Sequence, residues 1–229
     1  MKILDFIFPP KCPFCGKILT EALPLCSECA DTLPYTGAKT CEICSKPMPD
    51  LSYRLCAACH KERRHFKKSF AALVYEDKAQ HAVISFKYYF HPSYANAFAY
   101  LIADKLLQAS DPLMRFDFIT FIPQSRKTFL DRGYNQSELI AKKLAKILKL
   151  PCKSTLFRTN ESTRQATLNA SQRRKNVVSS YFLKESDLSG TALLVDDVYT
   201  TGATANYCSR LLKKAGCSEV YLAIALIRM

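Results

Sequence analysis

The sequence has no apolar run long enough to cross a membrane. Its uninterrupted apolar stretches are short, and the one at residues 222–227 has six residues, whereas a spanning helix needs roughly 20. The segment before Lys11 is too short for the apolar part of a signal peptide, and it lacks a small-residue cleavage site. Eleven cysteines without an export signal lead us to expect a cytoplasmic protein that binds metal and forms no disulfides.

Acidic residues are scarce relative to basic ones. The chain has 33 Lys and Arg against 20 Asp and Glu, so its formal charge is +13. Residues 126–175 alone contribute +10 of this excess. One interpretation is a solvated helix face followed by a loop. The other is a phosphate-rich partner, either a nucleotide-like molecule or the backbone of a nucleic acid.

Eight of the cysteines form four Cys-x-x-Cys pairs, and two such turns complete a tetrahedral zinc site. The predicted metal ligands are Cys12, Cys15, Cys26, Cys29, Cys41, Cys44, Cys56 and Cys59. Residues 12–17 resemble residues 41–46, which favours duplication of one unit and two consecutive four-cysteine sites. Crossed pairing of the turns and the loss of one ion stay open. Since no ligand position is open, the zinc is expected to be structural.

The cysteine pattern divides the chain into a zinc-ribbon module at residues 1–65 and a second domain at residues 66–229. The module is too small to bury a core of its own, so metal ligation should carry its folding. Apolar residues dominate segment 3–8 before the first cysteine. This segment either packs back on the protein or gives a weak, reversible attachment to a membrane surface or a docking partner.

From residue 69 onward the pattern alternates between strands and amphipathic helices. This alternation predicts an α/β fold, a parallel sheet with helices on both faces. The expected strands are residues 69–75, 116–123, 177–183, 192–196 and 219–227. The expected helices are residues 79–88, 94–109, 136–148 and 203–215.

The most informative stretch is residues 192–204, in which a buried strand leads to Asp196 and Asp197 and then to a hydroxyl-rich glycine turn that opens a helix. Such a turn directs backbone N–H groups and the positive end of the helix at a phosphate. Neighbouring carboxylates can accept hydrogen bonds from ribose hydroxyls and favour a nearby Mg²⁺. Gly202 stands where a phosphate turn needs glycine.

These residues resemble the phosphoribosyl pyrophosphate (PRPP) fingerprint of type I phosphoribosyltransferases. Together with the double zinc ribbon and residues 132–136, Arg-Gly-Tyr-Asn-Gln, they resemble the ComF/GntX competence family over nearly the whole chain. The resemblance implies a zinc-ribbon module fused to a type I phosphoribosyltransferase-like domain, required for uptake and processing of transforming DNA. It implies ribose contacts from Asp196 and Asp197 and a 5′-phosphate loop formed by Thr200, Thr201, Gly202, Ala203 and Thr204.

Further anion contacts are expected around this loop. Residues 123–126 resemble the loop that holds pyrophosphate in this fold, which adds Arg126, and Lys87 and Arg132 are further candidates. The ligand would be PRPP with Mg²⁺. Basic residues resembling the family's hood, at 158, 164–165 and 173–176, are candidates to close over it. The aromatic rings of Tyr134, Tyr199 and Phe129 either stack on a base or pack in the protein.

Three functions are compatible with these features. The first is a binding module that holds a PRPP-like ligand while its basic surface binds single-stranded DNA. The second is a working phosphoribosyltransferase; the sequence identifies neither an acceptor pocket nor a general base, so it leaves catalysis open. The third is a scaffold whose zinc module and N-terminal segment dock a helicase or a membrane translocase.

Overall fold

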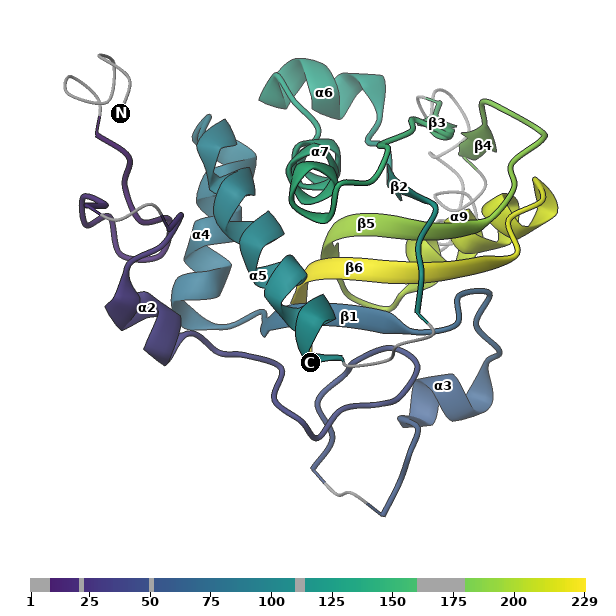
Figure 1. The fold of residues 1–229 in the computed structure, drawn as a ribbon, viewed down its shortest axis with the longest axis horizontal. Helices are drawn as coiled ribbons and strands as arrows, with labels where there is room; N and C mark the ends of the chain where they lie inside the picture. Colours follow the sequence, from purple (N-terminus) through teal and green to yellow (C-terminus); the bar gives the residue numbers. More distant parts are fainter. Residues whose placement is uncertain (1–8, 21–22, 50–51, 110–113, 160–179) are drawn as a thin grey trace, which may run out of the picture.

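The computed structural model describes residues 9–20, 23–49, 52–109, 114–159 and 180–229. Their centre is a parallel sheet with strand order β1-β6-β5-β2 (Figure 1). These strands are β1 (Ser69–Val74), β2 (Phe118–Phe121), β5 (Thr191–Tyr199) and β6 (Glu219–Ile227). Nearly all residues of β1, β2 and β6 are buried, as expected when both faces of a parallel sheet are covered, whereas β5 is only partly buried at Asp196, Asp197 and Val198.

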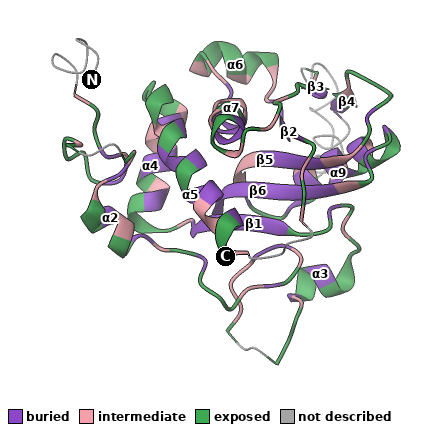
Figure 2. Cartoon of the chain, viewed as in Figure 1, coloured by how far each residue is buried: buried purple, intermediate pink, exposed green. Residues whose placement is uncertain are grey.

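Helices cover both faces of this sheet and bury two separate cores (Figure 2). One core lies under α4 (Asp77–Tyr88), α5 (Ala95–Gln108) and α7 (Gln136–Leu148), and the other under α9 (Ala203–Lys214). Successive strand residues alternate between them: Leu193 and Val195 belong to the first core, Leu194 to the second. The predicted α/β fold with a parallel sheet is confirmed.

Several elements differ from the sequence-based expectation. Strand β5 runs on to Tyr199, three residues beyond its expected end at Asp196, so Asp197 also lies within the strand. Helix α6 (Arg126–Arg132) was not predicted, because it buries no residue and so has no apolar periodicity. The side chain of Ser125 caps its start by accepting a hydrogen bond from the Thr128 N–H at 3.2 Å.

A small antiparallel pair stands apart from the main sheet. Strand β3 (Leu156–Arg158) pairs with β4 (Tyr181–Leu183), whereas residues 177–179 of the strand expected at 177–183 lie outside the described residues. A short 3₁₀ turn, η1 (Pro92–Tyr94), links α4 to α5.

The cysteine-rich front end consists of two copies of one small unit. In each copy an antiparallel bridge closes the first turn, Lys11 to Ile18 and Thr40 to Pro47. A short helix then begins after the third cysteine, α2 (Ser27–Thr32) in the first copy and α3 (Ala57–Lys61) in the second. The predicted internal repeat is therefore present in the backbone.

The two ribbons pack on opposite faces of the sheet. Phe14 of the first ribbon meets Phe98 of α5 edge-to-face at 6.0 Å, within the core on the α5 side. Phe66, which follows the second ribbon, belongs to the core on the α9 side. The ribbons thus add shared apolar contacts to the stabilisation expected from metal alone.

The segment between the ribbons covers the free edge of the sheet. Tyr35 forms an antiparallel bridge with Leu73, and the Val74 N–H donates to the Pro34 carbonyl at 2.7 Å. The Thr36 N–H donates to the Ala72 carbonyl at 3.2 Å. An edge strand that is paired in this way offers no template for association with another chain.

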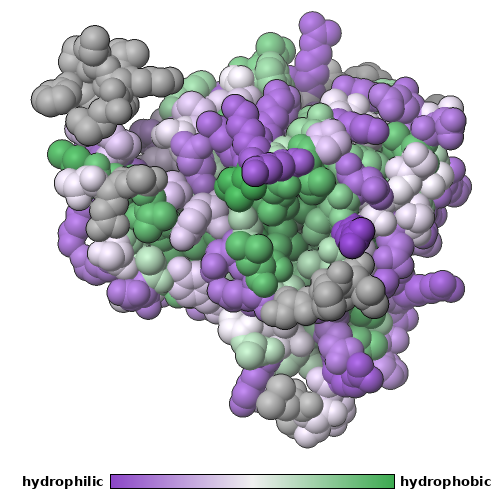
Figure 3. Space-filling view, in the orientation of Figure 1, coloured by the Kyte–Doolittle hydropathy of each residue, from purple (hydrophilic) through white to green (hydrophobic). Residues whose placement is uncertain are grey.

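Within the described part of the chain, no helix is long and apolar enough to cross a membrane. The apolar segment 3–8, for which a weak membrane or docking contact was considered, lies outside the described residues. Hydrophilic residues dominate the rim of the molecule, and an apolar area occupies the middle of one face, over α5 and α7 (Figure 3).

Candidate functional site

A polar cavity of about 210 Å³ opens at the carboxyl end of β5. In open parallel sheets this is the edge at which ligands bind. The end of β5, the turn that follows it and the first turns of α7 and α9 form its walls. Its lining comprises Lys87, Ile122, Pro123, Gln124, Arg132, Asn135, Gln136, Ser137, Arg158, Tyr181, Asp196, Asp197, Val198, Tyr199, Thr200, Thr201, Gly202, Ala203, Thr204 and Ala205.

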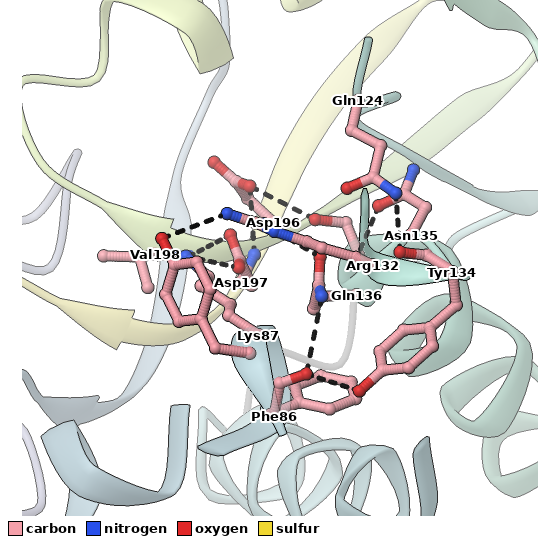
Figure 4. A network of polar contacts seen from close by, with 12 residues as sticks. Phe86, Lys87, Gln124, Arg132, Tyr134, Asn135, Gln136, Asp196, Asp197 and Val198 are labelled. Atoms are coloured by element: carbon pink, nitrogen blue, oxygen red, sulfur yellow. Dashed lines mark hydrogen bonds and ion pairs between the residues drawn. The ribbon is translucent and has the colours of Figure 1, made fainter. Parts of the chain in front are cut away.

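Two adjacent carboxylates line the floor of this cavity (Figure 4). Asp196 accepts hydrogen bonds from the Asp197 N–H at 2.9 Å and from the Ser137 hydroxyl at 3.3 Å. Asp197 accepts one from the Val198 N–H at 2.8 Å. Burial, followed by the charge of Asp197, raises the pKa of Asp196 well above its ordinary value. A cation or a hydroxyl-bearing ligand would relieve this repulsion.

Lys87, at the end of α4, reaches across the cavity to this carboxylate pair. Its Nζ lies 2.6 Å from Asp197 Oδ2, and both side chains are largely buried. The contact places one positive charge beside two negative ones. Separating a buried ion pair is costly, so a ligand that draws Lys87 away from Asp197 has to supply compensating charges.

The turn from Thr200 to Gly202 also lines the cavity. Gly202 has φ +76° and caps the N-terminus of α9. A Cβ added there would lie 2.0 Å from the hydroxyl oxygen of Tyr199, so the turn requires glycine both for its conformation and for space. The first N–H groups of a helix have no partner within the helix, and together with its dipole they attract anions.

A second helix N-terminus lines the same cavity. Asn135 caps α7 by accepting from the Ser137 N–H at 3.1 Å, and its side-chain amide donates to the Ile122 carbonyl at 3.1 Å. Ser137 and Tyr181 were not among the site residues predicted from the sequence. The start of α7 was predicted, but only the fold reveals that Ser137 contacts Asp196.

Arg132 forms the basic rim. Its guanidinium donates to Gln136 Oε1 and to the Tyr88 hydroxyl, both at 3.3 Å, and lies 4.9 Å above the Tyr88 ring. Arg158 also lines the cavity, whereas Arg126, on the first turn of α6, is not among its lining residues. The hood residues 164–165 and 173–176 lie outside the described residues.

Two of the three aromatic residues considered for base stacking are packed instead. Tyr134 stacks on Phe86 at 5.6 Å and donates its hydroxyl to the Phe86 carbonyl. Tyr199 is buried and meets Phe66 edge-to-face at 6.5 Å. Phe129 is 45% exposed on α6. Stacking on a ligand base by Tyr134 or Tyr199 would therefore require them to leave the core.

The front end holds two metal centres. The Sγ atoms of Cys12, Cys15, Cys26 and Cys29 lie within 4.8 Å of one another, and those of Cys41, Cys44, Cys56 and Cys59 do the same. This confirms two consecutive sites over crossed pairing. Four sulfur ligands in a compact group fit tetrahedral Zn²⁺. Burial disfavours the Cys41 thiolate, yet backbone N–H groups that hydrogen-bond to it lower its pKa to about 7, which prepares it for metal.

Both halves of the chain match known protein families. Residues 3–65 match the double zinc ribbon domain, and residues 135–229 match the phosphoribosyl transferase domain. The two four-cysteine centres are therefore the zinc sites of a double zinc ribbon.

Three curated relatives link these halves to named proteins. Competence protein F of Haemophilus influenzae is 37% identical over 93 residues, which cover 39% of this chain and 41% of that protein. DNA utilization protein YhgH of Escherichia coli O157:H7 is 31% identical over 105 residues, 45% of this chain and 46% of that protein. The aligned regions thus span less than half of these two relatives.

Competence protein ComFC of Streptococcus pneumoniae is more distant but aligns nearly end to end. It is 26% identical over 226 residues, which cover 92% of this chain and 96% of that protein. The family resemblance found in the sequence is confirmed: this chain joins a double zinc ribbon to a phosphoribosyltransferase domain and is a homologue of the competence proteins F and ComFC.

Proposed function

We propose that the cavity at the end of β5 binds a phosphoribosyl ligand, PRPP with Mg²⁺ or a close relative. The observation that carries the proposal is the position of the 200–204 turn at the positive end of α9, directly beside Asp196 and Asp197. A sugar phosphate needs this combination, because its phosphate seeks N–H donors while its hydroxyls seek acceptors.

Each part of the cavity then has a role. Thr200, Thr201 and Thr204 with the N–H groups of the turn would hold the 5′-phosphate, and the carboxylate pair would accept from the 2′- and 3′-hydroxyls. Mg²⁺ bound with the ligand would supply positive charge to neutralise the pyrophosphate. Lys87 would leave Asp197 and move to the pyrophosphate, joined by Arg132. Arg126 would contribute only as a more distant charge.

We propose further that the protein serves natural competence, acting on single-stranded DNA during uptake or use. The names of the relatives support this role. The charge of +13, concentrated in residues 126–175, supports an anionic polymer as the partner. Zinc-bound thiolates favour a reducing compartment, so we assign the protein to the cytoplasm. Docking of a helicase or translocase remains a prediction.

Calorimetric titration with PRPP and Mg²⁺ tests the ligand assignment. We expect heat from the wild-type protein, at least about 10-fold weaker binding for Asp197→Asn, and unchanged binding for Asp31→Asn, an exposed carboxylate in the first ribbon. Ribose 5-phosphate should bind more weakly than PRPP, and ribose more weakly still. Absence of heat from every phosphorylated ribose would contradict the proposal.

Catalysis is the second candidate function. The observation that favours it is the presence of Lys87 and Arg132 on the wall where pyrophosphate would leave, since fixed cations stabilise a departing anion. In that reaction the bond from the anomeric carbon to the pyrophosphate oxygen breaks, and a bond to an unidentified nucleophile forms. Pyrophosphate release with a panel of bases, ammonia sources and DNA ends tests it. Release that Asp197→Asn abolishes would favour the transferase.

A further inference from the structure

Three consecutive aromatic side chains project from the protein beside the cavity. Tyr88, Tyr89 and Phe90 end helix α4 and are 62%, 65% and 65% exposed. Large apolar rings at a helix end are ordinarily packed, because burying each of them stabilises the fold. We call these three residues the aromatic platform. Its exposure requires an explanation other than folding.

The backbone conformation of Phe90 is also not explained by folding alone. Tyr89 is the C-cap of α4, and its N–H donates to the Ser85 carbonyl at 3.0 Å. Phe90 follows at φ +55°, the left-handed conformation that glycine adopts most easily at this position. A bulky residue in this region is strained. The chain therefore places an aromatic ring where local structure favours glycine.

The aromatic platform joins the cavity through a basic side chain. Arg132 lies 4.9 Å above the Tyr88 ring, donates to its hydroxyl, and also lines the cavity. Lys87, which precedes the platform, lines the cavity as well. The Phe90 ring lies near Gly133, where an added Cβ would be 3.4 Å from it. Two of the three exposed rings, Tyr88 and Phe90, thus lie beside Arg132 and its neighbour Gly133, next to the cavity that holds the carboxylate pair.

We propose that the aromatic platform stacks the bases of a single-stranded nucleic acid whose backbone follows Lys87 and Arg132 toward the cavity. Every base has a π-face, and surfaces that combine exposed rings with cations bind single strands with little sequence preference. The occupant has the chemistry that the cavity itself selects, a sugar and a phosphate. The inference rests on the proposed role in handling DNA and identifies the surface that performs it.

The absence of tryptophan makes a direct test possible. The chain has no Trp, so Tyr89→Trp introduces a single fluorophore on the platform, and Tyr53→Trp introduces one at a comparably exposed site in the second ribbon (68% exposed). We expect an oligothymidylate of about 12 nucleotides to quench the first and to leave the second unchanged. No quenching of Tyr89→Trp by a strand that the wild type binds would overturn the inference.

Phe90→Gly separates binding from folding. Glycine relieves the strained backbone, so the variant should melt at the same temperature as the wild type or higher. Its affinity for the strand, measured by polarisation at several salt concentrations, should fall about 5- to 100-fold. Tyr53→Ala serves as the control and should bind as the wild type does. Equal affinity of Phe90→Gly and wild type would overturn the inference.

Three further measurements distinguish a membrane-binding surface, the absence of any DNA binding and an effect on the cavity. If vesicles of anionic lipid shift the Tyr89→Trp fluorescence and the strand does not, the platform is a membrane surface and the inference is wrong. If the wild type binds no strand even at low salt, the DNA role itself fails. PRPP titration of Phe90→Gly tests the cavity separately, since Phe90 is not among its lining residues; a heat equal to that of the wild type is expected.

Discussion

The two zinc ribbons have the same local design but different surroundings. In both, the residue after the second cysteine adopts a positive φ, +77° at Gly16 and +57° at Ser45. All four cysteines of the second ribbon are buried, whereas Cys15 of the first is exposed and Cys26 is only half-buried. The first ribbon packs toward α5, and the second packs toward α9.

Among the described residues, the second ribbon and the residues that follow it contact the part of the chain that carries the 200–204 turn. Phe66 packs edge-to-face against Tyr199, whose hydroxyl lies under Gly202. The His65 N–H donates to Asn206 Oδ1 at 2.7 Å, on the second turn of α9. Arg64 is almost fully buried beside Cys59. The comparison teaches that two copies of one motif can pack against different faces of a sheet, and that the second copy lies against the turn for which we propose phosphate binding.

The largest effect should come from removing one metal ligand in each ribbon. Both Cys12→Ser and Cys41→Ser should release about one zinc ion and destabilise the protein by about 5 kcal/mol or more, because metal binding contributes directly to folding. Only Cys41→Ser should also abolish PRPP binding. Zinc analysis, limited proteolysis and calorimetry at low temperature measure the three effects. Unchanged zinc content and protease resistance in Cys41→Ser would contradict the account.

Two comparable phenylalanines, one packed beside each ribbon, allow the difference between the ribbons to be tested without removing a metal ligand. Phe14 and Phe66 are both buried and both make an edge-to-face contact. Phe14→Ala and Phe66→Ala should each lower the free energy of unfolding by about 3–5 kcal/mol. At a temperature where both variants are folded, only Phe66→Ala should weaken PRPP binding, since it removes the support under Tyr199. Equal affinities would disprove the link between the second ribbon and the cavity.

Two glycines allow a smaller test. At Gly202, alanine would have to adopt a positive φ and its Cβ would clash with the Tyr199 hydroxyl. At Gly37, alanine would also have to adopt a positive φ, +56°, but its Cβ would have no atom within 4 Å. We expect costs of about 2–3 kcal/mol at Gly202 and about 1 kcal/mol at Gly37, measured by denaturant unfolding. PRPP binding should be lost only at Gly202. Retained binding there would mean that the turn does not hold the phosphate.

The smallest effect is a difference in pH dependence. Burial raises the pKa of Asp196, so the folded state retains a proton that the unfolded chain loses, and this group destabilises the protein as pH rises above about 4. Asp196→Asn should remove that decline. A hydrogen bond from Lys17 lowers the pKa of exposed Glu28 in the first ribbon, so its small stabilising effect is present above about pH 4.5 and disappears at lower pH. Melting curves across pH 2–8 should show the Asp196 slope above about pH 4 and the Glu28 slope, of opposite sign, below about pH 4.5.

The sequence predicted the parts of the molecule that depend on local pattern. Cysteine spacing predicted zinc binding, and the internal repeat favoured the two consecutive sites that the fold brings together. Apolar periodicity predicted the sheet and its four long helices. Helix α6 was missed because an exposed helix has no apolar stripe. The end of β5 was misplaced because a cavity in the fold accommodates carboxylates that a strand would ordinarily exclude.

The relations between distant residues could not be predicted from local pattern. Ser137 meets Asp196, and Lys87 meets Asp197, across 59 and 110 positions of the sequence. The face of the sheet on which each ribbon packs could not be predicted either, because it also depends on contacts between residues that are distant in the sequence. Such contacts depend on how the helices pack on the two faces of the sheet, and a short sequence motif does not predict this packing.

A structure of the protein crystallised with PRPP and Mg²⁺ tests the central claim most directly. The account predicts density for the 5′-phosphate against the 200–204 turn and for the ribose hydroxyls on Asp196 and Asp197, with Lys87 displaced toward the pyrophosphate. An empty cavity at saturating ligand, with Lys87 still on Asp197, would contradict it.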